Sequence, residues 1–340
     1  MGTHTIQMNT RGGITLPPKL GLHSMSYAGM FYDGPALSIR DVVDRAKRFG
    51  MGGIELHAGA PHALPYLMSK RDRQEVAAYM QARGIELSAI AGRNDFSSPV
   101  TEHRDANVQM VIELIHLCKD LGAPVLRVCT AMAGSSRRDG QATYEIARPG
   151  YERAFPDTTF SERWQYCLEC FRIVSRFAED DGIVLALQNH PPVVRNHTDC
   201  LAIIEEVNSP NLRMSFDISG ERAWQSTEWV LAAAHRIGKR WVHSHYGGDF
   251  KREPDGIVKR IPLGRGMGPR DGGMDSNDDA WVQGMYEVGY AGYVNYEACT
   301  ATYLPTGRYV TLATIDDRVQ MGRDYMLQLF AKHAPKEKTS

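Results

Sequence analysis

Short apolar runs alternate with amphipathic segments along almost the whole chain, and this alternation most limits how it can fold. Eight runs have the length and apolar character of buried strands, and each is followed by a segment with helical periodicity. The strands are expected at residues 19–24, 52–58, 85–92, 124–130, 183–190, 212–219, 240–247 and 293–299. Eight strand–helix units in strict order predict an α/β protein, a parallel (β/α)8 TIM barrel.

The intervening helices complete this organisation. They are expected at residues 38–50, 69–84, 101–122, 161–182, 197–208, 227–238, 278–289 and 316–333, with Ser69 as an N-cap. The barrel is expected to be a single domain over residues 18–332, with an N-terminal extension at 1–17 and a C-terminal tail at 333–340. Two long polar segments, 131–160 and 248–276, are expected to form loops that cover a substrate.

A doubly wound open sheet is the alternative fold, since alternation alone does not prove that the sheet closes. The stretch GRGMG at 264–268 could suggest a dinucleotide site. It does not match G-x-G-x-x-G, however, and Pro269 follows where a phosphate-binding helix would begin. We therefore expect a closed barrel without a nucleotide cofactor.

Charge and hydropathy restrict the partners. The net charge is −1 over 340 residues with both signs interspersed, so no basic face is expected for nucleic acid or an anionic membrane. No run approaches the roughly 18 apolar residues that span a bilayer. The first residues, MGTHTIQMNTRGG, also lack the apolar centre of a signal peptide. These features predict a cytoplasmic protein with a small neutral or weakly charged ligand.

The cysteines form no regular framework. Cys167 and Cys170 make a CxxC pair, but they lie at helical spacing and no second pair follows. A buried helix face is therefore favoured over zinc or redox chemistry.

Polar residues gather at the C-terminal ends of the predicted strands, where barrels of this kind have their active sites. They are His23, Glu55, His57, Asn94, Asp95, Arg127, Gln188, Asn189, His190, Asp217, His243, His245 and Glu297. Each alone has an ordinary structural explanation, such as a hydrogen-bonded strand end. Together, an Asp, a His and a Glu ending strands six to eight, with an amide from strand five, can hold one divalent ion.

Several stretches resemble the sugar phosphate isomerase/epimerase superfamily, the xylose-isomerase-like barrels that include ketose epimerases, inosose dehydratase and endonuclease IV. They are GGIELHA, VLALQNH, MSFDIS, WVHSHYGGD, IPLGRGMG and GYAGYVNYEAC, within residues 18–332. The last fits the family pattern GY-x-G-x-x-x-x-E and is the most specific. The resemblance implies one divalent ion held by Gln188, Asp217, His245 and Glu297. Mn²⁺ is the first expectation, with Mg²⁺, Co²⁺ or Zn²⁺ as alternatives.

The chain departs from that family at two positions. Gln188 stands where the family usually has Glu, and Gly220 stands where many epimerases have His. An amide oxygen can bind a metal ion, but it cannot accept a proton. Because epimerases of the family use two carboxylates on opposite faces of the substrate, two-base epimerisation is disfavoured here. One-base enolisation followed by isomerisation, dehydration or elimination stays open.

The proton acceptor is therefore expected to be a histidine, or Glu297 in a changed role. His190 is preferred because it lies two residues beyond Gln188, on the same face of an extended strand; His57 and His243 are the alternatives. Asn189, which points the opposite way, is expected to tie the strand to its surroundings. Substrate contacts are expected from His23, Glu55, Arg127, His243 and Arg265.

A weaker resemblance leads to the catalytic subunits of C-glycoside deglycosidases, which cleave a 3-keto-glycoside by enolisation and elimination with a small partner subunit. The favoured function is thus a metal-dependent isomerase or lyase acting on a keto-sugar or an oxidised glycoside, as a homo-oligomer or with a small partner subunit. A ketose 3-epimerase or an inosose dehydratase-like enzyme is the alternative within the family. A non-catalytic sugar-binding or scaffold barrel is the alternative of another class. An endonuclease IV-like role is disfavoured by the near-zero charge.

Overall fold

Eight parallel strands close into a barrel in the computed structural model, which describes residues 10–11, 14–15, 18–132, 136–138, 141–143, 156–221, 226–261, 276–298 and 310–335. Around the barrel the order is β3, β4, β5, β6, β9, β10, β11 and β14, and β14 pairs with β3. The strands are β3 (Lys19–His23), β4 (Gly53–His57), β5 (Glu86–Ala91), β6 (Val125–Val128), β9 (Val184–Gln188), β10 (Leu212–Ser215), β11 (Trp241–Tyr246) and β14 (Tyr293–Tyr296). The predicted closed barrel is confirmed, and the open sheet is excluded.

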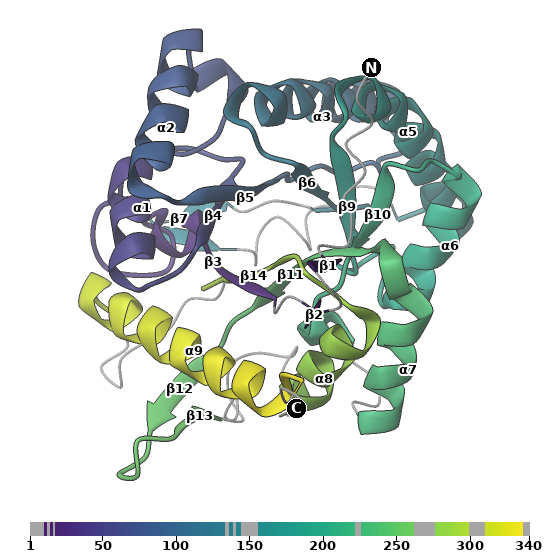
Figure 1. Ribbon diagram of the computed structural model, residues 1–340. Coiled ribbons are helices and arrows are strands. Elements are labelled where there is room, and N and C mark those ends of the chain that lie inside the picture. Colours follow the sequence, from purple (N-terminus) through teal and green to yellow (C-terminus); the bar gives the residue numbers. More distant parts are fainter. Residues whose placement is uncertain are drawn as a thin grey trace.

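One helix follows each barrel strand, and Figure 1 shows these helices as a ring around the strands. They are α1 (Ile39–Arg48), α2 (Lys70–Arg83), α3 (Thr101–Leu121), α5 (Phe160–Asp181), α6 (His197–Val207), α7 (Thr227–Ile237), α8 (Asp278–Val288) and α9 (Leu312–His333). Most limits agree with the sequence-based expectation within one or two residues. Helix α9 begins earlier than residue 316, because the Thr311 side chain accepts a hydrogen bond from the amide of Thr314 and caps the helix there.

Local sequence signals explain where the helices start and stop. Ser69 caps α2 as predicted, and the Asp72 carboxylate in return accepts a hydrogen bond from the Ser69 amide; Thr159 and Glu162 cap α5 in the same way. Gly122 and Gly182 end α3 and α5 in the left-handed conformation that suits glycine. These caps fix the helix lengths and so the positions of the strand ends that follow.

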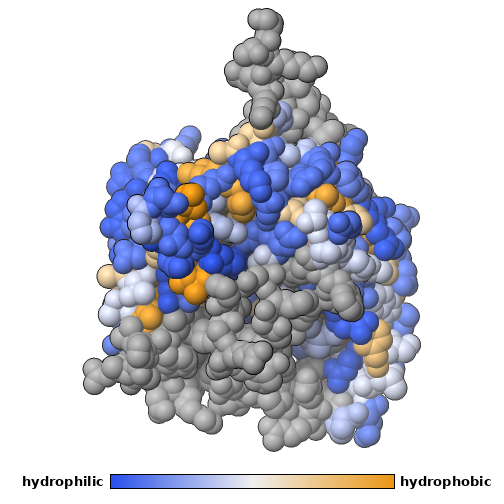
Figure 2. Space-filling model, turned by 90° about the horizontal axis from the view of Figure 1, so that it is seen from below, coloured by the Kyte–Doolittle hydropathy of each residue, from blue (hydrophilic) through white to orange (hydrophobic). Residues whose placement is uncertain are grey.

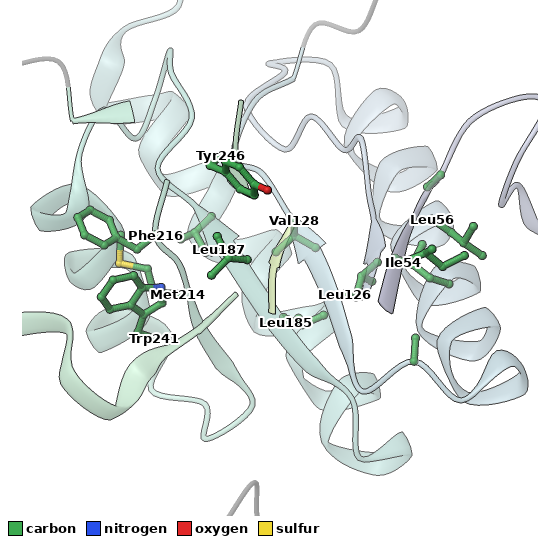
Figure 3. Close-up of a cluster of buried hydrophobic side chains, with 14 of the residues drawn as sticks. Ile54, Leu56, Leu126, Val128, Leu185, Leu187, Met214, Phe216, Trp241 and Tyr246 are labelled. Atoms are coloured by element: carbon green, nitrogen blue, oxygen red, sulfur yellow. The ribbon is translucent and has the colours of Figure 1, made fainter. Parts of the chain in front are cut away.

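The largest part of the core lies between the strands and the helices. Large side chains that point outward from the strands pack against the helix ring, and ten of them are labelled in Figure 3: Ile54, Leu56, Leu126, Val128, Leu185, Leu187, Met214, Phe216, Trp241 and Tyr246. A second buried cluster is made of the small residues Ala89, Val125, Val184 and Ala186. They alternate with the outward-pointing residues and so face the barrel interior.

The two long segments expected as loops contain short hairpins. Strands β7 (Ser136–Arg138) and β8 (Gln141–Thr143) pair in the first, and β12 (Asp249–Arg252) and β13 (Val258–Ile261) pair in the second. The second hairpin is bonded to α9, because Gln328 exchanges hydrogen bonds with the backbone of Val258. It projects from the rim of the barrel in Figure 1. Residues 262–275, including Arg265, lie outside the described part, so the expected substrate cover stays a prediction.

The described surface in the view of Figure 2 is mainly hydrophilic, with apolar side chains in small separate groups. No helix in the described ranges is long and apolar enough to cross a membrane. Cys167 and Cys170 are both buried with free thiols, which confirms the helix-face interpretation of the CxxC pair.

Candidate metal centre

Inward-pointing strand ends bring the predicted site residues to one end of the barrel. His23 ends β3, Glu55 and His57 belong to β4, Gln188 ends β9, and His245 belongs to β11. Asp217 and Glu297 follow β10 and β14 directly. The first five are at most 4% exposed, and the Glu297 side chain is 12% exposed, so the cluster is shielded from water. Charged groups at such depth need partners, whether protein, ion or substrate.

Three pairwise contacts link the four residues expected to bind metal. The Gln188 amide nitrogen donates to Oδ2 of Asp217 at 3.1 Å and lies 3.4 Å from Nδ1 of His245. Nδ1 of His245 is in turn 3.8 Å from Oε2 of Glu297. Only the oxygen of an amide binds a cation, so ligation by Gln188 would require its amide to turn and exchange nitrogen for oxygen. The donor set then has two carboxylates, one imidazole and one amide, which suits a divalent ion.

Glu55 fixes the orientation of His245. Oε2 of Glu55 lies 2.6 Å from Nε2 of His245. A carboxylate only accepts, so Nε2 carries the hydrogen, and the lone pair of the neutral ring is on Nδ1. That lone pair faces Gln188 and Glu297. A carboxylate that holds the far nitrogen of a ligating histidine is a common arrangement around metal ions, so this geometry fits an ion on the Nδ1 side.

A second group of donor atoms also converges. Ligand atoms of His23, Glu55 and His245 all lie within 4.8 Å of one another, and all three residues are buried. By distance alone this triad is compatible with one divalent ion. His23 and Glu55 were expected as substrate contacts, and the sequence did not indicate them as metal ligands.

Burial and opposite charge set the pKa values in the cluster. Burial opposes ionisation of Glu55, but His243, His245 and His23 outweigh this cost and hold its pKa well below the usual range. Burial disfavours the charged form of His245 as well, yet Glu55 and Glu297 raise its pKa. Burial raises the pKa of Glu297. Burial also lowers the pKa values of His23 and His57, which favours neutral rings.

Asn189 holds two of the predicted ligands in register, as expected. Its side-chain oxygen accepts from the amide of Asp217 at 2.9 Å, and its nitrogen donates to the carbonyl of Asp217 at 2.9 Å. The same nitrogen lies 3.2 Å from Oε1 of Glu221, a buried carboxylate that also binds His197. The peptide of Asp217 is thereby tied to the residue next to Gln188. No residue pattern indicated the part played by Glu221 and His197.

Arg127 and His243, both expected to contact the substrate, are bonded to other parts of the protein. Arg127 donates to the carbonyl of Gly92 at 2.9 Å, and its Nε has no hydrogen-bond partner in the described ranges. His243 has partners at both nitrogens: Ser215 at 2.8 Å from Nδ1, and Glu55 at 3.1 Å from Nε2. This favours a positioning role for His243. The substrate contacts expected from both residues stay predictions.

His190 lies beyond the end of its strand. Strand β9 ends at Gln188, and the amide of His190 bonds back to the Gln188 carbonyl at 2.8 Å. The backbone therefore turns there, and strand alternation does not decide where His190 points. Its Nδ1 is 2.7 Å from the carbonyl of Pro191. A carbonyl only accepts, so Nδ1 carries the hydrogen, and the neutral ring has its lone pair on Nε2.

Two polar residues beneath the centre were missed. Asn295 lies 3.2 Å from Nε2 of His243, and Ser88 donates to Oδ1 of Asn295 at 3.1 Å. Asn295 is two residues before Glu297, so the strand period of two placed it on the same inward face. A polar residue at that position was the signal that could have found it. Together with His243 it links the barrel interior to Glu55.

Residues 43–317 match the family described as xylose isomerase-like TIM barrel, and the chain belongs to this family. Among similar solved structures is D-psicose 3-epimerase with D-fructose present: TM-score 0.65, 16% identity, covering 92% of this chain and 99% of that one. L-ribulose 3-epimerase has TM-score 0.64 and 14% identity over 94% and 99% of the two chains. The apo form of 3-keto-D-glucoside 4-epimerase from E. coli has TM-score 0.61 and 14% identity over 92% and 99%. At these identities the likeness establishes the shared fold.

Proposed function

We propose that this protein is a divalent-metal-dependent sugar isomerase or lyase that acts by enolisation beside the carbonyl of a keto-sugar or a 3-keto-glycoside. The observation that carries the proposal is the set of contacts in which Gln188 and Glu297 both lie beside Nδ1 of His245 and Gln188 bonds to Asp217, while Nε2 of His245 is held by Glu55. A divalent ion held there would polarise a sugar carbonyl and stabilise the negative charge that develops when a neighbouring C–H proton leaves.

The side chains of the site then divide the remaining work. Asp217 and Glu297 supply the negative charge that a cation requires, and Asn189 keeps Asp217 in place. In the absence of an ion, burial raises the pKa of Glu297, the carboxylate that is also proposed as a proton acceptor. Gln188 cannot accept a proton, so it cannot serve as a second base.

This asymmetry favours a one-base reaction. Inversion of a carbon centre by two bases needs a proton acceptor on each face of the substrate, whereas isomerisation or β-elimination needs one. His190 and Glu297 are the proposed acceptors. The structural relatives named as 3-epimerases and as a 3-keto-D-glucoside 4-epimerase support a keto-sugar or oxidised glucoside as substrate class. Cleavage of a C-glycoside, with a small partner subunit, is a narrower form of the proposal.

Deuterium exchange tests the function whatever the final product is. Purified protein with and without Mn²⁺ is incubated in D₂O with D-fructose, D-psicose, D-tagatose, an inosose and a 3-keto-glucoside, and the C–H signals are followed by NMR. We expect Mn²⁺-dependent exchange at a carbon next to a carbonyl in at least one sugar. Asp217→Ala should abolish exchange and bound metal together. Full metal content in that variant would refute the ligand set, and sugar binding without exchange would indicate a non-catalytic barrel.

A further inference from the structure

His23 is held in one tautomer by the backbone. Its Nδ1 accepts a hydrogen bond from the amide of Met25 at 3.0 Å, which caps the short helix η1 (Ser24–Tyr27). A backbone amide only donates, so Nδ1 carries the lone pair of a neutral ring and Nε2 carries the hydrogen. Binding a cation through Nε2 would move that hydrogen to Nδ1, where it would face the Met25 amide. His23 is therefore a hydrogen-bond donor toward the site.

The Nε2 hydrogen of His23 faces carboxylate oxygens of Glu55 and Glu297 that are too far away to accept a hydrogen bond. Nε2 of His23 lies 3.9 Å from Oε1 of Glu55 and 3.6 Å from Oε1 of Glu297. Both His23 Nε2 and Glu55 Oε1 are buried and have no hydrogen-bond partner within the described ranges. The second oxygen of Glu55 is already bonded to His245 and His243. One buried donor and one buried acceptor thus face the same small space.

A hydroxyl group satisfies both atoms at once. An oxygen that accepts from one group and donates to another lies about 2.8 Å from each, so its two partners are roughly 4.5 Å apart at a tetrahedral angle and roughly 4 Å apart at a right angle. The separation of 3.9 Å between Nε2 of His23 and Oε1 of Glu55 is at the short end of this range and gives a bridging hydroxyl a nearly right angle at its oxygen. A cation would leave the His23 hydrogen opposed to positive charge, and a phosphate or carboxylate would face Glu55. The chemistry of the pair therefore selects a neutral group that is both donor and acceptor.

Resting on the proposed function above, we infer that His23 Nε2 and Glu55 Oε1 form a subsite for one hydroxyl of the sugar, on the Nε2 side of His245, while any cation lies on the Nδ1 side. A water molecule can occupy the subsite when no sugar is bound. A sugar lacking the hydroxyl that belongs there leaves the site with a water or with two unpaired buried groups. His23 thereby becomes a residue that determines which polyhydroxy substrate is accepted.

His23→Asn separates the two roles of this histidine, capping helix η1 and donating a hydrogen bond to the subsite. Asparagine is a good N-cap and can still accept from the Met25 amide, but it is too short to reach the subsite with its nitrogen. His62→Asn is the matched control, since His62 is another buried histidine, hydrogen-bonded to the Leu37 carbonyl. Near-ultraviolet circular dichroism checks that both variants are folded. If His23→Asn is not folded, His23→Gln serves as the second variant.

Two measurements then decide the inference. The first is Mn²⁺ content with Mn²⁺ alone, where His23→Asn should keep the wild-type stoichiometry; loss of the ion would make His23 a ligand and overturn the subsite. The second is the ¹⁵N spectrum of histidine-labelled wild-type protein, which should show a neutral His23 with its hydrogen on Nε2. The opposite tautomer would equally overturn the inference. Neither measurement depends on activity.

A deoxy scan tests the hydroxyl itself, with the keto-sugar that exchanges fastest among D-fructose, D-psicose, D-tagatose and 3-keto-D-glucoside. One mono-deoxy analogue should lose about 10²-fold in kcat/KM, below the roughly 10⁴-fold limit of such sites because water can refill the space. This penalty should fall below about 10-fold in His23→Asn and persist in His62→Asn. A flat scan, or an unchanged penalty in His23→Asn, would overturn the subsite and leave enolisation intact. No exchange with any sugar would remove the proposed function itself.

Discussion

Nε2 of His245 lies 2.6 Å from Oε2 of Glu55, and both side chains are buried among the barrel strands. Strand β4 supplies the carboxylate and β11 the imidazole, so the pair joins distant parts of the chain across the barrel interior. The contact decides which nitrogen of His245 can bind an ion. It also gives Glu55 a purpose distinct from that of Asp217 and Glu297, because its bonded oxygen faces away from the proposed ion.

Glu55→Gln should weaken metal binding without removing the site. The substitution removes the negative charge that keeps the hydrogen of His245 on Nε2. Loss of such a supporting partner typically costs about 10- to 100-fold in metal affinity. Titration of the metal-free protein with Mn²⁺ measures the change. Glu86→Gln is the control, since Glu86 is a more exposed glutamate paired with Lys19 at the other end of the barrel. Complete loss of the ion in Glu55→Gln alone would instead indicate direct ligation by Glu55.

Gln188→Glu should tighten metal binding and destabilise the protein without metal. The new carboxylate would stand near Oδ2 of Asp217, which is 3.1 Å from the present amide nitrogen. In the absence of an ion the two like charges repel; with an ion both attract it. The affinity should rise at least about tenfold, since unit charges 4 Å apart attract by roughly 4 kcal/mol near a protein surface.

Thermal unfolding and Mn²⁺ titration check this prediction together. The melting temperature of Gln188→Glu should lie below that of the wild type without Mn²⁺ and rise further when Mn²⁺ is added. Gln188→Met is the control, because it keeps a similar size but removes the oxygen, and it should bind the ion more weakly. Equal Mn²⁺ affinities in all three proteins would show that residue 188 does not ligate.

Much of this arrangement was predictable, and the reasons for the remainder are physical. The period of two along each strand placed Glu55, Gln188 and His245 at one end of the barrel, and the structure confirms their convergence. The direction of His190 was not predictable, because the strand stops at Gln188 and a turn replaces the alternation. The tautomer of His23 depends on one backbone amide, which no residue pattern reveals. The short polar hairpins have no apolar periodicity by which to recognise them.

Acid should destabilise the metal-free protein below about pH 6.5, the usual pKa of histidine. Burial lowers the pKa values of His23, His57, His62 and His243, so the unfolded chain binds protons there that the folded protein does not. Stability therefore rises with pH in that range, by up to about 1.4 kcal/mol per unit for each such residue. His245 and Glu297, whose pKa values are raised, contribute in the opposite sense but are outnumbered.

Urea unfolding between pH 5.5 and 7.5 measures this slope. His62→Gln should reduce the slope, because His62 lies outside the metal-binding set and its pKa is lowered by burial. An identical slope in this variant would show that His62 does not contribute. Mn²⁺ should be absent throughout, since a bound ion would stabilise the folded state by mass action and mask the effect.

His190→Ala should slow enolisation while the ion stays bound. The hydrogen on Nδ1 faces the Pro191 carbonyl at 2.7 Å, so the neutral ring presents Nε2 as a proton acceptor. Loss of a positioned base typically costs about 10²–10⁴-fold in rate. The rate of deuterium exchange and the metal content are measured on the same preparation. His57→Asn is the comparison, because His57 is one of the two other histidines expected as base and, unlike His243, does not bond to Glu55 in the described ranges. A full rate in His190→Ala together with a large loss in His57→Asn would identify His57 as the base. If neither variant loses rate, Glu297 would be the acceptor.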